Sequence, residues 1–310
     1  MGNQSTYGAG ARAAEVPPNM PPDARPQTSP PEEFTVVPLR HPGRWLCAAL
    51  MLFVLLSIAD LLITNPRWEW RTVLDYLFSA PILAGVGNTL LLTVLAEIVG
   101  IGLGILLAIM RLSENPLLSW SSAGFTWIFR GIPPLVMILF IYFFSALVPT
   151  LSIGIPFGPS IKLIATNKVV TQMAAAVIGL GLAQAAYVSE IVRSGILSVS
   201  AGQSRAALAL GMTPLRAMRH IIFPQAMRVV IPPLSNEVIS MVKATSLVSV
   251  IAYTELLTTV QVIYARTFEQ IPLLMVAVIW YGAITTVLTL VQSRIEKRLN
   301  KSVKVMKKEK

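Results

Sequence analysis

Long apolar runs are the feature that most restricts what this chain can fold into. The run from Ile82 to Met110 is longer than the ~20 residues that a helix needs to cross a hydrocarbon core. Hydrophobic residues make up 54% of the chain and charged residues only 13%, which excludes a soluble globular protein. We therefore predict an all-α integral membrane protein.

The apolar runs divide the chain into about six predicted spans. These spans cover residues 45–63, 82–110, 132–148 and 169–192, a stretch that begins after Arg228, and residues 272–291. Four parts follow: a Pro-rich tail (1–40) expected to be disordered, an extra N-terminal span with an external segment (41–80), a transmembrane domain (81–293) and a basic tail (294–310).

The net charge of +10 comes from basic residues that collect in the tails and between the spans. By the positive-inside rule, this distribution places both termini in the cytoplasm of a multi-pass plasma membrane protein. The tail from Arg294 to Lys310 is expected to contact membrane lipids. No basic face with interleaved aromatic residues is present, so nucleic acid is not an expected partner.

Several polar side chains fall inside predicted spans, where a charge needs a partner or water. Glu97 either lines a pathway or pairs within the helix bundle, and the sequence leaves both open; Asn88 and Thr93 are predicted to share its face. Lys243 is expected to face the bundle, with Glu237 as one partner. The candidates for the pathway or for substrate contact are Asn88, Glu97, Asn236, Lys243, Thr245 and Ser246.

A polar segment from Arg205 to Gln225 interrupts the apolar runs on the predicted cytoplasmic side. Its small residues Ala206, Ala207 and Gly211 predict a low helix surface that another protein can approach. Pro214 ends that helix, and a second short amphipathic helix is predicted to end at Pro224. An interfacial loop that only holds spans together is the alternative.

This segment resembles the EAA loop of ABC importer permeases, in which a coupling helix docks into the ATPase subunit. The family positions are occupied here by Ala206, Ala207, Gly211, Ile221 and Pro224. Arg205 stands where the family usually has an acidic residue. The resemblance therefore implies that about residues 194–225, including Arg205, couple to an ATPase, and Glu190 is a hypothetical substitute for the missing carboxylate.

Two further runs resemble the polar amino-acid uptake group of these permeases. Residues 129–136 read FRGIPPLV, similar to FRGTPLLV, and residues 236–247 match the family stretch NxxIxLxKxTSL at Asn236, Lys243, Thr245 and Ser246. The resemblance implies a permease with a core of about five helices plus one extra N-terminal span in a bacterial inner membrane. Its implied partners are ABC ATPase subunits that bind ATP and Mg, a periplasmic or lipid-anchored amino-acid-binding protein, and itself or a sister permease as a dimer.

No enzyme motif is present in the chain itself. The sequence lacks GxxxxGK[ST], HExxH and GxSxG patterns. We expect no catalytic residue, cofactor or metal site here, with ATP hydrolysis left to a partner. The alternative from another class is a stand-alone, ion-coupled secondary transporter with Glu97, Glu237 and Lys243 as its relay.

Overall fold

The computed structural model describes residues 42–155 and 158–308, so the predicted disordered tail lies outside the described residues. The chain divides into two units, Met1–Ile63 and Thr64–Lys310. In the first unit, α1 (Pro42–Thr64) is a helix of 23 residues, long enough to cross a membrane. It contains the predicted span 45–63.

Four further helical runs are long and apolar enough to be spans. They are α3 (Ala80–Arg111), α8 (Gln172–Leu197), the run Pro214–Ile251, and the part of α13 (Gln270–Lys308) up to Leu299. A bent pair, α4 (Pro116–Gly131) and α5 (Pro134–Tyr142), forms one more candidate, with 101° between its helices. The all-α membrane fold is confirmed, with five spans in the described residues, or six if the bent pair counts as one.

The predicted single helix over 132–148 is wrong. Helix α5 ends at Tyr142 after 9 residues, and a separate short helix, α6 (Phe144–Leu147), follows. A 9-residue helix rises only about 14 Å, less than half of a ~30 Å hydrocarbon core. Hydropathy missed the break because the residues on both sides of Phe143 are hydrophobic.

A β-hairpin lies between the predicted spans 132–148 and 169–192. Strands β1 (Thr150–Gly154) and β2 (Ser160–Ala165) pair antiparallel, with Thr150 opposite Ala165 and Gly154 opposite Ser160. Both strands carry isoleucine, which favours extended backbone, and glycine and proline lie between them. The short helix α7 (Thr166–Val169) follows.

Two hydrophobic clusters hold the second unit together. One joins α3, α5 and α8 with the 3₁₀ helix η4 (Thr245–Ile251) around Leu92, Ile138 and Leu180. The other joins α2 (Trp70–Leu77), α3, α12 (Leu256–Thr267) and α13 around Ile82 and Leu256. In this second cluster, Trp280 Nε1 also donates a hydrogen bond of 2.8 Å to the carbonyl of Leu77. Residues 64–80, which contain η2 (Pro66–Trp68) and α2, thus pack with the second unit.

The predicted end of a helix at Pro224 is also wrong. Helix α10 (Pro214–Ala217) continues through a π-helical turn, η3 (Met218–Ile222), into α11 (Phe223–Ala244) without a break. The amide of Phe223 bonds to the carbonyl of Met218, the wider spacing of a π turn. Pro224 then lies in the first turn of α11, where its missing N–H is tolerated. Pro232 and Pro233 lie inside α11.

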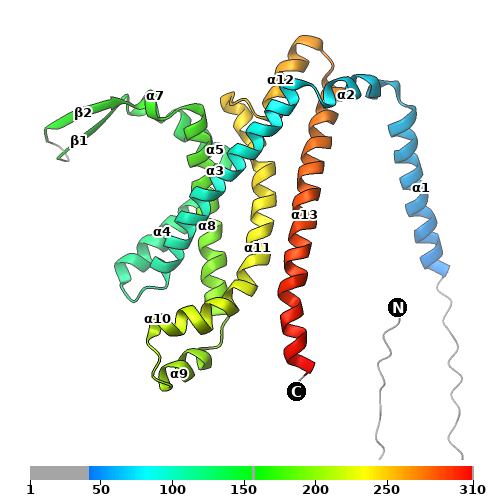
Figure 1. Cartoon of the computed structure of the whole chain (residues 1–310). Coiled ribbons are helices and arrows are strands. Elements are labelled where there is room, and N and C mark those ends of the chain that lie inside the picture. The colour runs from blue at the N-terminus through cyan, green and yellow to red at the C-terminus, as the bar shows by residue number, and fades with distance from the viewer. Residues whose placement is uncertain (1–41, 156–157, 309–310) are drawn as a thin grey trace, which may run out of the picture. The chain divides into compact units, whose positions relative to one another are not determined.

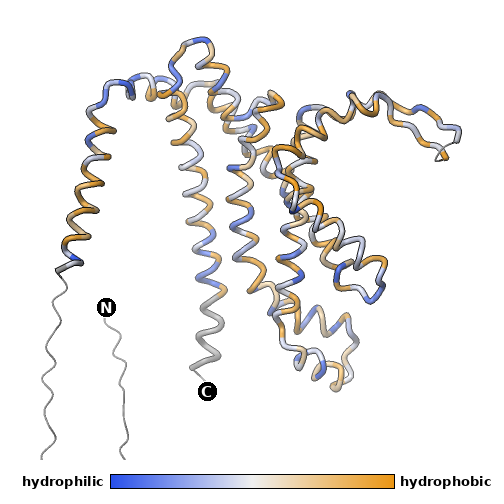
Figure 2. Tube along the Cα trace, turned by 180° about the vertical axis from the view of Figure 1, so that it is seen from behind, coloured by the Kyte–Doolittle hydropathy of each residue, from blue (hydrophilic) through white to orange (hydrophobic). Residues whose placement is uncertain are grey.

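The second unit has two distinct ends. Figure 1 shows α9 (Ala201–Ala209) and α10 at one end of the bundle, with α12 at the other. Figure 2 shows hydrophobic residues along the long helices and hydrophilic residues interspersed through the α9–α10 segment. The polar segment found in the sequence therefore lies at one end of the helices.

Candidate functional site

Helices α3 and α8 pack through glycines along a seam that also holds Glu97. A Cβ atom added at Gly100 would lie 2.5 Å from Gln184 Cγ, and one at Gly104 would lie 2.6 Å from Val188 Cβ. This four-residue spacing of small residues brings helix backbones close in membranes. Gly102 faces elsewhere, with nothing within 4 Å of its added Cβ.

Glu97 is buried in this seam with 6% of its surface exposed. Gln184 Nε2 donates a hydrogen bond of 3.1 Å to Glu97 Oε1. The other carboxylate oxygen is buried without a hydrogen-bond partner among the described residues. A cavity of about 170 Å³ between α5, α8 and α11 is lined by Gln184, Glu237 and Ser240. Glu97 thus pairs with a residue of the bundle that also lines a cavity.

The predicted common face forms only in part: Thr93 and Glu97, four residues apart, lie on one side of α3, but Asn88 does not. Asn88 Nδ2 donates to the carbonyl of Thr254 at 2.7 Å, and Thr93 Oγ1 donates to the carbonyl of Thr89 at 2.8 Å. Asn88 and Glu97 are nine residues apart, about two and a half helical turns, so they point to opposite sides of α3.

Glu237 and Lys243 do not form the expected ion pair. Within the described part of the chain, the salt bridge joins Glu190 and Arg193 instead. A six-residue spacing rotates two side chains about 120° apart on a helix, unlike spacings of three or four. Lys243 is exposed instead, and it shares a face of α11 with exposed Ser240 and Asn236. We call these three residues the polar stripe.

Thr245, Ser246 and Asn236 all form hydrogen bonds within the chain. Thr245 is buried and donates to the carbonyl of Val242 at 2.7 Å, while Ser246 Oγ donates to the carbonyl of Lys243 at 2.7 Å. Asn236 Oδ1 accepts a hydrogen bond of 2.9 Å from Gln292 Nε2 of α13. The structure therefore brings Asn236 and Lys243 together on one face and turns Thr245 away.

The sequence analysis did not identify a role for Glu255. The side chain is fully buried and caps α12 by accepting from the amide of Thr258 at 2.7 Å. Its carboxylate also accepts from Tyr281 of α13 at 2.6 Å and from Thr89 of α3 at 3.4 Å. Glu255 thus joins three helices at the end opposite to α9 and α10.

Gly211 closes helix α9 by a change in backbone conformation. Its φ of +76° lies in the left-handed region that glycine adopts without strain. The amide of Met212 donates to the carbonyl of Ala207 at 3.1 Å, and the amide of Gly211 donates to the carbonyl of Leu208 at 2.9 Å. These two bonds are the Schellman motif of a helix end. Gly211 is therefore required for the turn rather than for a low helix surface.

The other predicted coupling residues divide into buried and exposed groups. Ala207 is buried, with 1% exposure, where α9 packs against α10 and η3, so it is not part of an open surface. Arg205, Ala206 and Pro224 are exposed, and Ile221 is half-buried.

Large leucine side chains lie open to the outside at this end of the bundle. Leu210 is 83% exposed and Leu215 is 79% exposed, on the two sides of the Gly211 turn. Arg216, Arg219 and His220 are exposed beside them. An exposed apolar patch with a polar rim is typical of a protein interaction site.

The comparison with known families decides between the alternatives. The family of binding-protein-dependent transport system inner membrane components matches residues 100–303. The chain belongs to this family. It is a multi-pass inner-membrane permease component, and the stand-alone secondary transporter is not favoured.

Two named relatives illustrate the similarity. The arginine transport system permease protein ArgU of Corynebacterium glutamicum is 40% identical over 276 residues, which cover 88% of this chain and 85% of ArgU. The glutamate/aspartate import permease protein GltK of Escherichia coli O157:H7 is 37% identical over 161 residues, 52% of this chain and 66% of GltK.

Solved structures share the fold. A crystal structure of an amino acid ABC transporter with histidines has a TM-score of 0.60 and 32% identity, covering 70% of this chain and 94% of that one. An inward-facing structure of the MetNI methionine ABC transporter has a TM-score of 0.51 and 20% identity, covering 72% of this chain and 99% of that one. The second likeness concerns the fold alone.

Proposed function

We propose that this permease component carries a polar amino acid, delivered by a binding protein, in an importer driven by ABC ATPase subunits. The observation that carries the proposal is the exposed leucine pair, Leu210 and Leu215, around the Gly211 turn at one end of the bundle. Such a surface fits a groove of a partner subunit. That partner would bind ATP and Mg, because this sequence lacks a phosphate-binding loop.

The continuous helix from Pro214 to Ile251 supplies the coupling mechanism. A push on α10 is transmitted along α11 without a flexible loop between them. Closure of an ATPase dimer would therefore tilt α11 and switch the bundle between inward-open and outward-open packings. In this proposal Arg205, Ala206 and Pro224 meet the ATPase, while Ala207, Gly211 and Ile221 maintain the shape of the segment.

The polar stripe supports a pathway along this face of α11. An exposed lysine within a span is costly in lipid unless water or another protein covers it. Asn236, Ser240 and Lys243 would therefore face a pathway completed by a second permease subunit, identical or related. Both termini and the α9–α10 end would lie in the cytoplasm, in agreement with the positive-inside rule.

Basic amino acids are the first substrates to test. ArgU, which matches 88% of this chain, is named as an arginine transport system permease. Within the described residues, Glu97 keeps one buried carboxylate oxygen without a partner, and Glu237 lines the neighbouring cavity. A cationic side chain would compensate these two carboxylates. Competition by arginine, lysine, glutamine and glutamate for labelled arginine uptake measures the preference.

Co-purification tests the coupling surface. We expect the full-length chain, isolated from its native host in mild detergent, to retain an ATPase subunit and hydrolyse ATP. Leu215→Asp should reduce the retained ATPase more than tenfold, because burying a leucine contributes ~2 kcal/mol. Ile153→Asp is the matched control, since Ile153 is 70% exposed on β1.

Two results would contradict this proposal. One is full ATPase retention by the Leu215→Asp variant. The other is a chain that purifies alone and transports substrate in liposomes under an ion gradient, which would restore the secondary transporter.

A further inference from the structure

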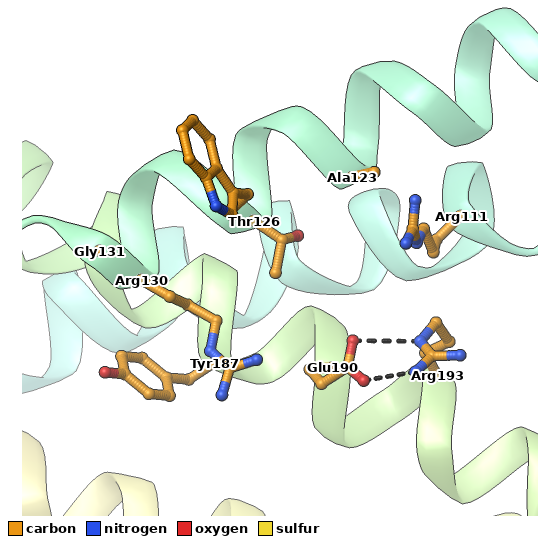
Figure 3. A pocket seen from close by; sticks show the side chains of 9 residues that line it. Arg111, Ala123, Thr126, Arg130, Gly131, Tyr187, Glu190 and Arg193 are labelled. Carbon is orange, nitrogen blue, oxygen red and sulfur yellow. Dashed lines mark hydrogen bonds and ion pairs between the residues drawn. The ribbon is translucent and has the colours of Figure 1, made fainter.

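A second polar site lies between α3, α4 and α8, and Tyr187 lines both this site and the smaller cavity beside Ser240. It is a cavity of about 510 Å³, within the range of about 300–1,000 Å³ common for small-molecule sites. Three arginines line it: Arg111 at the end of α3, Arg130 near the end of α4 and Arg193 in α8. Figure 3 shows these side chains around Glu190.

The charges of this pocket do not balance. Glu190 is the carboxylate that lines it, and it pairs with Arg193 one turn along the same helix. Arg130 stacks over the ring of Tyr187 at 5.3 Å, and Arg111 donates to the carbonyl of Ser119 at 3.0 Å. Neither Arg111 nor Arg130 forms a salt bridge with a described residue. The pocket therefore has an excess of two positive charges and suits an anion.

The surroundings place this pocket at the membrane surface. Arg111 is the last residue of a span, and Arg193 lies in the last turns of another, which leads into α9. Helix α4 exposes Trp120 at 77% and Trp127 at 80%, and Trp127 also lines the pocket. Exposed tryptophan at the ends of spans is typical of the interface between lipid and water.

We propose that this pocket binds the phosphate of an anionic phospholipid headgroup from the leaflet at the α9–α10 end. Guanidinium groups bind phosphate oxygens in a bidentate manner, and two of them, Arg111 and Arg130, line this pocket without a salt-bridge partner among the described residues. The acyl chains would leave past Trp127 along the apolar face of α4. The assignment to the cytoplasmic leaflet rests on the orientation in the proposed function.

The test is a titration of the purified full-length chain in detergent with dioctanoyl phosphatidylglycerol, followed by native mass spectrometry. Dioctanoyl phosphatidylcholine and inorganic phosphate are the comparison probes. We expect phosphatidylglycerol to bind more tightly than phosphatidylcholine, and each of Arg111→Gln and Arg130→Gln to weaken phosphatidylglycerol about fivefold. Arg266→Gln, an exposed arginine in the last turn of α12 and outside the pocket, is the charge-matched control and should have little effect.

Glu190→Gln gives a result of the opposite sign. Removing the carboxylate frees Arg193, so phosphatidylglycerol should bind more tightly, whereas a purely structural ion pair predicts no gain. This variant keeps the proposal testable if an arginine variant fails to fold.

Four outcomes would overturn the lipid site: equal binding of both lipids, equal loss in the Arg266→Gln control, no gain in Glu190→Gln, or binding of inorganic phosphate without preference for the lipid. None of them affects ATPase co-purification, so a failure here is distinguishable from a failure of the proposed function.

Discussion

The α3–α8 seam and the α9–α10 segment both depend on small residues, but for different physical reasons. In the seam, Gly100 and Gly104 leave room for Gln184 and Val188, and the backbones approach closely. In the segment, Gly211 has open space around it and is needed for its positive φ. The seam buries its contacts within the chain, whereas the segment leaves Leu210 and Leu215 exposed. Small residues alone therefore do not identify a docking surface.

The largest expected effect comes from filling the seam. In Gly100→Leu the new side chain would collide with Gln184 and displace its hydrogen bond to Glu97. Overpacking typically costs ~1–3 kcal/mol, so we expect a clear drop in the thermal unfolding temperature in detergent. Gly102→Leu is the control in the same helix, because Gly102 has nothing within 4 Å of its Cβ position. An equal drop in the unfolding temperature of both variants would show that close packing at Gly100 does not stabilise the bundle.

A smaller effect separates conformation from surface shape at Gly211. An L residue in the left-handed region costs ~1–2 kcal/mol, but asparagine tolerates it better than alanine. If glycine is needed for its backbone conformation, Gly211→Asn should keep more substrate-stimulated ATPase activity in the assembled transporter than Gly211→Ala. If glycine is needed for a low docking surface, Gly211→Ala should keep more of this activity, because alanine is smaller. The order of the two variants therefore discriminates between the two explanations.

The smallest effect on stability is expected at the polar stripe. Lys243→Met removes an exposed charge, so the free energy of unfolding should change by no more than ~0.5 kcal/mol. Uptake in whole cells should nevertheless fall strongly if Lys243 faces the pathway. Lys162→Met, an exposed lysine of β2, is the matched control and should transport normally. Normal uptake in Lys243→Met would remove the stripe from the pathway.

Hydropathy located the long spans well. The predicted span 82–110 lies inside α3, and the predicted 169–192 overlaps α8, which begins three residues later and ends five residues later. The late start follows from the cap, since the Thr171 hydroxyl accepts from the amide of Ala174. The late end follows from Glu190 and Arg193, which interrupt the apolar run but pair at helical spacing and so extend the helix.

Polar partners were predicted less well, because they depend on residues distant in the sequence. Glu97 bonds to Gln184, 87 residues away, and Asn88 bonds to Thr254, 166 residues away. Spacing along one helix indicates which side chains share a face, but not which helix that face meets. The pocket of Arg111, Arg130 and Arg193 was not foreseen for the same reason, since its arginines come from three helices.

The sequence by itself determined that this is a helical membrane protein with a polar segment between two spans. Apolar length and charge distribution are local properties that a bilayer selects directly. Only the tertiary structure decided that Glu255 joins α3, α12 and α13, and that Lys243 is exposed rather than paired. These features depend on how helices rotate and pack against one another, because a side chain's partners are set by the packing of the whole bundle.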